Sequence, residues 1–287
     1  MNKTTLLKSY IHAPEILVIP GVPDPLCARI AQQMGFRAVF VSGYASSAAT
    51  LGAPDIGLMT MTEMVDCAWR IVDAVDLPVF ADGDTGHGNV NNVIRTMRQF
   101  EKAGVAALFF EDQVSPKRCG HMAGKQVVPP EEMIAKIHAA VDTRLDRDLI
   151  IMARTDALAI HGIDDAIARM HRYLEAGADM AFIEAPSSVE EMRRITAEIQ
   201  APSMANMVPG GRTPVLSARE LERLGFACVA HPTALTYAIA KTATGLLEHL
   251  YRTGTTAGLE DRMMSFAEFN EVVGLPAVRA REERYSG

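Results

Sequence analysis

The sequence contains few cysteines, and their spacing excludes two common uses of the residue. Cys27, Cys67, Cys119 and Cys228 are widely separated and form no Cys-x-x-Cys pair, the usual spacing of structural zinc ligands. A disulfide-stabilised scaffold needs a much denser set of cysteines. Three of the four stand in apolar sequence, whereas Cys119 has basic neighbours. Cys119 is therefore the thiol for which we expect a chemical role.

Long apolar runs and basic runs are also missing. No apolar run approaches the roughly 18 residues that a membrane-spanning helix requires, so no association with a membrane is expected. The N-terminal segment MNKTTLLKSYIHAPE lacks an apolar stretch followed by a small-residue cleavage site, which favours a cytoplasmic location. The net charge is −7 with no basic block, unlike a nucleic-acid-binding protein. The expected partner is a small molecule.

Helical segments that end in glycine and lead into short apolar runs recur along the chain. Four such passages are QQMGFRAVFVSG, EKAGVAALFFED, LEAGADMAFIEA and ERLGFACVAHP, with Gly35, Gly104, Gly177 and Gly225 at the predicted helix ends. The runs EILVIPG, LPVFADGD, LIIMARTD and PSMANM bring the predicted strands to eight. Continuous apolar strands are typical of a parallel sheet covered on both faces. They predict an α/β fold of the (β/α)8 barrel type, with a doubly wound sheet as the alternative.

The predicted barrel forms a single domain over residues 1–287, with a helical extension from about 233 to 287. After Thr233 the segment ALTYAIAKTATGLLEHLYRTG predicts a long helix, a second helical pattern lies around residues 265–274, and the charged tail VRAREERYSG follows. Helices beyond a complete barrel often pack against a neighbouring subunit, so an oligomer is expected. The alternative is a helix that closes the bottom of the barrel.

Polar residues follow six of the predicted strands. Because the active site of such barrels lies at the carboxyl ends of the strands, these residues are expected to converge at one mouth. They are Ser42 and Gly43, Asp82 and Asp84, Glu111 and Asp112, Arg154 and Asp156, Glu184, and Asn206.

The carboxylates of this set predict a metal site. Asp82 and Asp84 stand two apart in DGDTGHGN, and in extended chain both would point the same way. Glu111 and Asp55 would supply further oxygens from adjacent loops. Gathered carboxylates without a matching lysine cluster repel one another unless a hard cation neutralises them, so Mg²⁺ is predicted, with Mn²⁺ able to replace it. Alternatively, Asp82 caps the next helix and Glu111 pairs with an exposed arginine.

Arg154, in MARTD, stands where a planar guanidinium could bind a substrate carboxylate at two points. The alternative is an ion pair with Glu184 or Asp156, and both can hold. The backbone N–H groups of Ser42 and Gly43, together with the side chain of Asn206, would bind another carboxylate or a hydroxyl. These residues indicate a small, multiply anionic, oxygen-rich substrate.

Two histidines remain ambiguous on sequence alone. His87 lies between two glycines in TGHGN. It could act as an acid or base, or it could only form hydrogen bonds within the loop, and the sequence favours neither interpretation. His231, before Pro232, has the same two interpretations.

Cys119 stands in the stretch SPKRCGHMAGK, which Pro and Gly keep from forming a regular helix or strand. Lys117, Arg118 and His121 surround the thiol in sequence. Neighbouring positive charge lowers a thiol pKa, so Cys119 is a candidate acid, nucleophile or metal ligand.

Together these residues resemble the isocitrate lyase and phosphoenolpyruvate mutase superfamily, whose carbon–carbon lyases carry a K-[KR]-C-G-H signature on a mobile gating loop. The signature here is KRCGH, residues 117–121. Members are (β/α)8 barrels that exchange a terminal helix with a neighbour and assemble as tetramers, so the resemblance implies a homotetramer. Further matches in family order are VSGYASSAATLGAPDIG, FADGDTGHGN, FFEDQVSPKRCGH, IMARTDALA, FIEAP and NMVPGGRTP.

The resemblance also implies roles for individual residues. Mg²⁺ would be held by Asp82, directly or through water, with Asp55, Asp84 and Glu111 as partners through water. Cys119 would be the general acid that protonates the enediolate left when a 2-hydroxy diacid is cleaved. Lys117 and His121, with Arg118, would stabilise the resulting thiolate. The implied substrate contacts are Ser42, Gly43, Tyr44, Gly120, Arg154, Glu184 and Asn206.

Two departures from the family bear on the substrate. Isocitrate and methylisocitrate lyases carry a tyrosine where Phe40 stands here, and methylisocitrate lyases carry an arginine for the third carboxylate where Tyr237 stands. The segment NMVPGGRTP resembles the GGKTP form of dimethylmalate lyases, the petal death protein and carboxyphosphonoenolpyruvate phosphonomutase. A 2,3-dimethylmalate or 2-alkylmalate type of lyase, giving a 2-oxo acid such as pyruvate plus a carboxylate, is expected.

Several alternatives remain open at this point. A 2-methylisocitrate lyase and an enzyme like carboxyphosphonoenolpyruvate phosphonomutase are the nearest. Enzymes acting on phosphonopyruvate generally lack the Cys-Gly-His signature. A Schiff-base aldolase would need a lysine after the sixth strand, where this sequence has FIEAP instead. A non-catalytic paralogue is a third alternative, and the intact metal and loop residues count against it.

Overall fold

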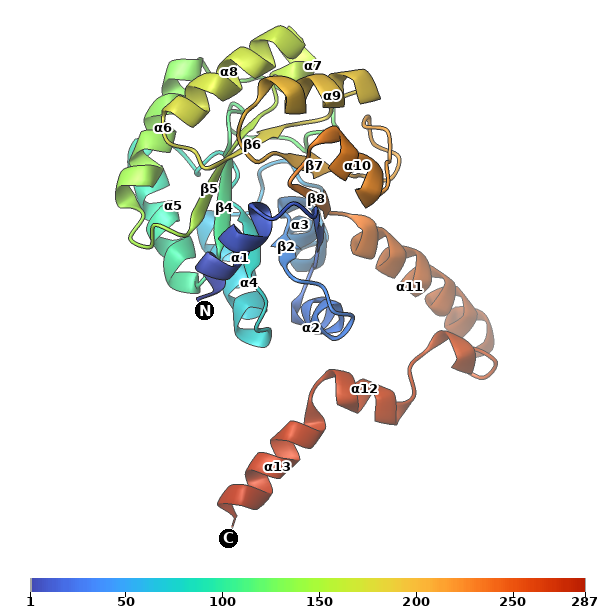
Figure 1. The fold of residues 1–287 in the computed structure, drawn as a ribbon. Coiled ribbons are helices and arrows are strands. Elements are labelled where there is room, and N and C mark those ends of the chain that lie inside the picture. Colours follow the sequence, from blue (N-terminus) through green and yellow to red (C-terminus); the bar gives the residue numbers. More distant parts are fainter. Residues whose placement is uncertain (1, 287) are drawn as a thin grey trace.

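A computed structural model describes residues 2–286, and its centre is a barrel of parallel strands (Figure 1). Hydrogen bonds join five strands in the order β2-β3-β4-β5-β6 and three in the order β1-β8-β7. The strands are β1 Leu17–Pro20, β2 Val39–Val41, β3 Val79–Asp82, β4 Ala107–Glu111, β5 Ile150–Thr155, β6 Met180–Ile183, β7 Met204–Asn206 and β8 Cys228–His231.

Two short bridges close these sheets into one ring. Gly21, after β1, pairs in parallel with Phe40 of β2, and Ala181 of β6 pairs in parallel with Ser203, which precedes β7. The strands therefore follow one another around the barrel in chain order. This confirms the predicted (β/α)8 barrel and excludes a doubly wound sheet.

Helices follow the strands and cover the outside of the barrel (Figure 1). The glycines that the sequence placed at helix ends do end them, since Gly104 and Gly225 adopt left-handed backbone at the C-caps of α5 and α10, a conformation that glycine adopts at no steric cost. The helices are α2 Pro25–Gln33, α3 Gly43–Leu51, α4 Met61–Ala74, α5 Val90–Ala103, α6 Pro130–Thr143, α7 Leu158–His161, α8 Ile163–Glu175, α9 Val189–Glu198 and α10 Ala218–Leu224.

The interior of the barrel is filled by large side chains from alternate strand positions. Phe80, Phe109 and Met152 are among them, and Leu7 and Ile11 of α1, Lys3–Ile11, belong to the same buried cluster. Helix α1 is therefore the element that packs on the inner core, so the alternative in which a C-terminal helix closes the barrel is wrong. The opposite, carboxyl end of the strands is left for the site.

The last helices leave the barrel as an arm (Figure 1). Helix α11, Ala234–Thr253, has no buried residue, and α12, Phe266–Val272, packs against α2. The tail that the sequence suggested only as charged forms α13, Leu275–Tyr285, after a short 3-10 turn at Glu260–Arg262.

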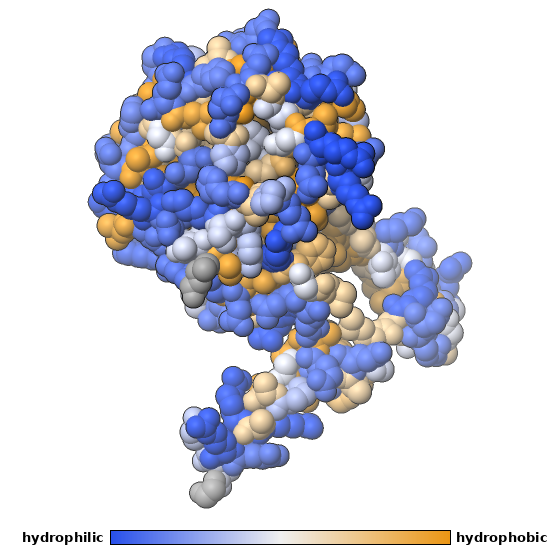
Figure 2. Space-filling view, viewed as in Figure 1, coloured by the Kyte–Doolittle hydropathy of each residue, from blue (hydrophilic) through white to orange (hydrophobic). Residues whose placement is uncertain are grey.

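Large apolar side chains of the arm face solvent, and apolar surface is visible along it in Figure 2. Tyr251 is 93% exposed, Phe266 86% and Leu247 62%. Contiguous exposed apolar surface is typical of an interaction site. No helix within residues 2–286 is both long and apolar enough to cross a membrane.

Candidate active site

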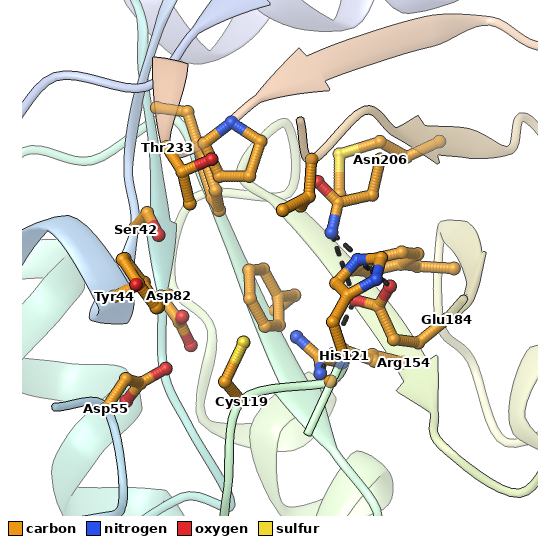
Figure 3. Close-up of a pocket in the computed structure, with 17 residues that line it drawn as sticks. Ser42, Tyr44, Asp55, Asp82, Cys119, His121, Arg154, Glu184, Asn206 and Thr233 are labelled. Carbon is orange, nitrogen blue, oxygen red and sulfur yellow. Dashed lines mark hydrogen bonds and ion pairs between the residues drawn. The ribbon is translucent and has the colours of Figure 1, made fainter. Parts of the chain in front are cut away.

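A cavity opens at the carboxyl ends of the strands and collects most of the residues that the sequence singled out. Figure 3 shows Ser42, Asp82 and Asp55 on one side of it and Arg154, His121, Glu184 and Asn206 on the other, with Cys119 between them. The predicted site residues that line it are Ser42, Tyr44, Asp55, Asp82, Cys119, Gly120, His121, Arg154, Glu184 and Asn206.

The other predicted residues lie directly behind this lining. Gly43 donates its backbone N–H to Oδ2 of Asp82 over 2.9 Å, and Glu111 contacts Arg154. Lys117 and Asp84 contact each other and belong to the acidic cluster.

The cavity also has apolar lining that sequence reasoning did not assign to the site. Phe109 and Phe182 stand at inward positions of β4 and β6, where large residues fill a barrel, so their pattern resembles that of any core residue. Thr233 follows β8 and could have been found by the strand-end rule that found the other polar residues. The residues missed are Phe109, Phe182, Met204, Val208, Pro232 and Thr233, and Phe40, noted only as a departure from the family, lines the cavity as well.

The buried ammonium of Lys117 lies among the carboxylates. Its Nζ is 2.7 Å from Oδ1 of both Asp55 and Asp84, and its side chain is 5% exposed. Burial lowers the pKa of Lys117, but Asp84, Asp82, Glu111 and Asp55 outweigh that effect and raise its pKa well above the ordinary value. The sequence argument rested on the lack of a matching lysine cluster. The structure adds one lysine, which the loop that carries KRCGH places among the carboxylates.

Asp84 does not continue the extended strand, contrary to the sequence-based expectation. Its backbone is left-handed, with φ 49°, and its N–H donates to Oδ1 of Asp82 over 2.9 Å. Burial raises the pKa of Asp84 to about 7, although Lys117 opposes the rise. The turn, rather than strand alternation, brings the two side chains together.

Glu111 is a buried carboxylate that its described protein neighbours do not hydrogen-bond. Its side chain is fully buried, and neither carboxylate oxygen has a hydrogen-bond partner among residues 2–286. Burial raises its pKa well above the ordinary value, with Arg154 and Lys117 opposing. Oε2 still lies 3.3 Å from Nη1 of Arg154, so Oε1 is the oxygen without a hydrogen bond or ion pair within residues 2–286. A buried carboxylate oxygen of this kind matches the oxygen-ligand chemistry of Mg²⁺.

In this conformation no group of three or more His, Cys, Asp or Glu side chains in the described part of the chain is arranged as a metal site. The nearest set by chemistry is Asp55, Asp82, Asp84 and Glu111, the residues selected from the sequence. Their carboxylate oxygens fit a divalent cation in donor type. Neither sequence-based alternative applies. The next helix, α5, is capped by Asn89, while Asp82 accepts the N–H groups of Asp84 and of Gly43, the first residue of α3. The arginine beside Glu111 is buried rather than exposed.

Arg154 is held by three carboxylates at once. Its Nε and Nη2 bond to Asp156 at 2.9 and 3.1 Å, Nη1 lies 3.3 Å from Glu111, and Nη2 lies 3.5 Å from Glu184. The guanidinium also lies over the ring of Phe182, 5.2 Å from its centroid. The predicted ion pairs with Glu184 and Asp156 both exist, and they fix the guanidinium at the edge of the cavity (Figure 3).

Asp112, by contrast, points away from the mouth. Its carboxylate accepts from Thr155 Oγ1 at 2.7 Å, from the Asp156 N–H at 3.0 Å and from Tyr173 Oη at 2.9 Å. Burial raises its pKa despite these hydrogen bonds. It supports the turn after β5 and does not line the cavity.

The environment of Cys119 reverses the expectation of a lowered thiol pKa. Burial raises the pKa of Cys119 to about 11; the N–H of His121 opposes the rise, while Asp55 and Glu184 add to it. Lys117 is turned toward the acids, and the side chain of Arg118 is exposed. The thiol is therefore fully protonated near neutral pH.

The loop at residues 114–126, which carries the KRCGH signature, packs against the opposite wall of the cavity, and we call it the gating loop. The backbone of Gly120 is so close to the opposite wall that a Cβ there would be 2.5 Å from Nη2 of Arg154 and 2.4 Å from Cγ of Glu184. The N–H of Cys119 donates to the Asp55 carbonyl over 3.1 Å. His121 Nδ1 accepts from the N–H of Arg212 over 3.0 Å.

Glu184 connects this loop to the next strand. His121 Nε2 lies 3.3 Å from its Oε1, and Asn206 Nδ2 donates to its Oε2 over 3.1 Å. Burial raises the pKa of Glu184, but Arg154 and His121 outweigh that effect and leave it lowered. Glu184 is thus an ionised residue that orients an arginine, a histidine and an amide around the cavity.

Tyr44 and Tyr237 form a pair beside the cavity. Their rings meet edge to face with centroids 6.0 Å apart, and their hydroxyl oxygens are 3.5 Å apart. This contact, together with burial, raises the pKa of Tyr44 to about 12. Tyr237 itself does not line the cavity.

His87 and His231 also lie outside the cavity lining. Burial lowers the pKa of each, and in His87 the charge of Asp82 opposes the change. Neither histidine is in position to touch a ligand in this conformation.

Comparison with known sequences gives a consistent assignment. A family model described as phosphoenolpyruvate phosphomutase matches residues 7–251. The chain is 49% identical over 286 residues to 2,3-dimethylmalate lyase of Eubacterium barkeri, covering 100% of this chain and 99% of that protein. It is 39% identical over 281 residues to a 2-methylisocitrate lyase of Aeropyrum pernix, covering 98% and 90%.

Solved structures agree over the whole chain. Oxaloacetate acetylhydrolase in complex with 3,3-difluorooxalacetate is similar with a TM-score of 0.95 and 32% identity, covering 100% of this chain and 98% of that one. Phosphonopyruvate hydrolase in complex with oxalate and Mg²⁺ is similar with a TM-score of 0.89 and 28% identity, covering 100% of both. The KRCGH loop, the acidic strand ends and these similarities show that the chain belongs to the phosphoenolpyruvate mutase and isocitrate lyase superfamily, as a lyase that breaks a carbon–carbon bond.

Proposed function

We propose that the protein cleaves a 2-hydroxy dicarboxylate of the 2,3-dimethylmalate or 2-alkylmalate type into a 2-oxo acid such as pyruvate and a second carboxylate. The observation that supports this most is the cavity itself. Arg154 is the only lysine or arginine among its lining residues, and several acids surround it. One guanidinium and a cation among the acids match the two carboxylates of such a substrate.

The acidic cluster is proposed to hold Mg²⁺, with Mn²⁺ as a substitute, through Asp82, Asp55, Asp84 and Glu111. When bound, the cation would stabilise negative charge that develops on substrate oxygens during cleavage. The buried Glu111 oxygens, which accept no hydrogen bond within residues 2–286, and the Mg²⁺ in the phosphonopyruvate hydrolase complex support this assignment.

The chain's own residues then bind and orient the substrate. Arg154 would bind a carboxylate, while Ser42, Gly43 and Tyr44 contact it from the first turn of α3, whose N-terminus favours anions. Gly120, Glu184 and Asn206 would contact it from the opposite wall. Closure of the gating loop would exclude water, which strengthens these contacts.

Cys119 is proposed to donate the proton that completes the reaction. Cleavage leaves an enediolate, which is far more basic than a thiolate, so a thiol with a pKa of about 11 still gives up its proton readily. The raised pKa keeps that proton in place at neutral pH. The thiolate formed would lie near Arg154 and His121, with Lys117 supplying further positive field through the acidic cluster.

The lining that residues 2–286 form contains no lysine or arginine besides Arg154, which supports a dicarboxylate over 2-methylisocitrate. The rest of the lining includes the apolar residues Phe40, Met204 and Val208, beside which an unpaired buried charge costs several kcal/mol. The exposed side chain of Arg212 and the half-buried His231 do not line this wall.

A panel of 2-hydroxy diacids tests the proposal. Purified protein with Mg²⁺ is incubated with 2,3-dimethylmalate, 2-alkylmalates, 2-methylisocitrate and carboxyphosphonoenolpyruvate, and 2-oxo acids are detected by a coupled dehydrogenase. Cleavage of the malates that stops on exhaustive chelation and returns with Mg²⁺ or Mn²⁺ is expected. If 2-methylisocitrate or carboxyphosphonoenolpyruvate is converted faster than the malates, the proposed substrate is wrong and that compound takes its place.

The arm is proposed to serve assembly into a homotetramer with exchanged helices. Exposed apolar residues run along residues 233–287, and α11 has no buried residue in the isolated chain. A second copy that covers the arm would bury this surface, which is favourable by about 25 cal/mol per Å².

A further inference from the structure

Lys125 is a buried lysine that the proposed reaction does not use. Its side chain is 3% exposed, and its Nζ lies 2.7 Å from Oδ1 of Asp156. The same Nζ donates to the carbonyl oxygen of Gly120. Burying an ammonium is costly unless it is paired and hydrogen-bonded. The ammonium of Lys125 is therefore stabilised by these two contacts.

The contact with the Gly120 carbonyl fixes the tip of the gating loop. Gly120 packs against Arg154 and Glu184 so closely that no Cβ fits. A carbonyl in this position is shielded from water and needs a donor from the protein. Lys125 is that donor, and it holds the backbone of the cavity wall in its closed position.

The contact with Asp156 links Lys125 to Arg154, the arginine of β5. Asp156 binds Arg154 through both carboxylate oxygens. Burial would raise the pKa of Asp156, but Arg154 and Lys125 outweigh it and lower the pKa to about 2. The carboxylate is thus shared between two cations, one of which faces the cavity and the other of which belongs to the loop.

The base of the loop determines where Lys125 stands. Gln113 and Val127 form an antiparallel bridge, and the N–H of Val114 donates to the Gln126 carbonyl over 2.9 Å. Lys125 comes just before this closure, on the returning side of the loop. One ammonium therefore joins the loop's base, its tip and the carboxylate that orients Arg154.

We propose that Lys125 is a positioning residue that couples closure of the loop at residues 114–126 to the orientation of Arg154 through Asp156. Without the ammonium, the Gly120 carbonyl loses its buried donor and Asp156 retains Arg154 as its sole cation. The closed loop is then less populated, and the arginine is drawn more strongly to Asp156. The effect on turnover rests on the proposed function, whereas the effect on the loop does not.

Alkylation of Cys119 measures loop opening without reference to turnover. Lys125→Met keeps the length and the apolar stem of the side chain and removes the amine. We expect the rate of Cys119 alkylation by iodoacetamide, followed by peptide mass spectrometry, to rise about tenfold, since a buried hydrogen bond from a charged donor is worth about that factor. Rates measured over a range of pH separate a change in access from a change in the thiol pKa.

Lys136→Met is the matched control. Lys136 is also a buried lysine, bonded to one carbonyl, that of Thr85 at 3.3 Å, and to one carboxylate, that of Glu132 at 3.2 Å. It lies on α6 and has no contact with the loop tip. Its removal should leave Cys119 alkylation within about twofold of wild type.

Steady-state kinetics provide the second readout. Lys125→Met should lower kcat more than it changes KM, and Lys125→Arg, which restores the charge, should recover part of the loss. If the wild type cleaves no 2-hydroxy diacid while alkylation still rises in Lys125→Met, the proposed function fails and the coupling stands.

Unchanged alkylation in Lys125→Met, or an equal rise in Lys136→Met, overturns the proposal. Should Lys125→Met fail to fold, judged by circular dichroism and gel filtration, Lys125→Gln is measured in the same way. Its shorter side chain reaches at most one of the two partners, so wild-type alkylation in that variant would equally overturn the coupling.

Discussion

The ammonium of Lys117 lies 2.7 Å from the carboxylate of Asp84, joining the gating loop to the turn after β3. Both groups are buried, and the same ammonium contacts Asp55. The loop is therefore held over the barrel by charge as well as by backbone hydrogen bonds.

Lys117→Met should destabilise the protein by about 3–5 kcal/mol, because it leaves buried carboxylates without their counter-charge. If a divalent cation occupies the same cluster, Mg²⁺ should recover more stability in this variant than in wild type. Thermal unfolding with and without Mg²⁺ measures both effects. If Mg²⁺ stabilises the two proteins equally, the cation does not bind in this cluster.

Cys119→Ser should lower kcat by at least about 100-fold, because a hydroxyl is a much weaker acid than a thiol and general acid catalysis contributes about 10²–10⁴. Binding of a non-cleavable analogue of the substrate, measured by calorimetry, should change little, since the substitution is nearly isosteric. Near-normal turnover in this variant would exclude Cys119 as the proton donor.

The raised pKa of Cys119 also has a consequence for stability. A group whose folded pKa is above its unfolded value stabilises the fold below the unfolded pKa and loses that contribution as pH rises through the folded one. For Cys119 the window runs from 9.0 to about 11. Relative to Cys119→Ala, wild type should lose up to about 3 kcal/mol across it. Denaturant unfolding at several pH values measures the difference, and a constant difference would contradict the raised pKa.

Substrate preference should follow the lining of the cavity. We expect kcat/KM for 2,3-dimethylmalate to exceed that for 2-methylisocitrate by at least about tenfold, or about 1.4 kcal/mol in the transition state. A methyl group beside Phe40 gains about 0.8 kcal/mol by burial, whereas a third carboxylate loses water without gaining a cation.

Tyr237→Arg tests the physical reason for this preference. The arginine would stand where methylisocitrate lyases carry one, and it should raise the relative kcat/KM for 2-methylisocitrate. Steady-state kinetics on both compounds provide the measurement. If wild type already prefers the tricarboxylate, another basic residue reaches it, with Arg212 and His231 as the candidates.

Assembly should depend on the apolar surface of the arm. Tyr251→Asp combined with Phe266→Asp places charge on two of its most exposed apolar positions and should shift the protein to smaller species in light scattering after gel filtration. Leu145→Asp is the control, because Leu145 is 86% exposed on the barrel. Equal mass for all three proteins would argue against assembly through the arm.

The sequence predicted the barrel well because local signals agree with the global fold. Gly104 and Gly225 end helices where the chain turns into buried strands, and the polar strand ends meet at one mouth. These features follow from short-range rules, so they can be deduced from one sequence.

The electrostatics could not be deduced in the same way, because neighbours in sequence are not neighbours in space. Lys117 stands two residues from Cys119 but points into the acidic cluster, while Asp55 and Glu184, distant in sequence, face the thiol. Burial then sets the sign of the pKa shift. Lys125 was missed for the same reason, since nothing in HMAGK indicates that its amine reaches Asp156.

The contact between His121 and the loop after β7 limits how the enzyme can be re-engineered. A side chain at Gly211 would place its Cβ 2.6 Å from Nδ1 of His121, and the Arg212 N–H donates to that same nitrogen. The two loops therefore fit each other as a matched pair. When loops are exchanged between relatives, residues 114–126 should be transferred together with residues 208–213. Either loop alone would pack against a loop of different sequence, and steric clashes would keep the cavity open.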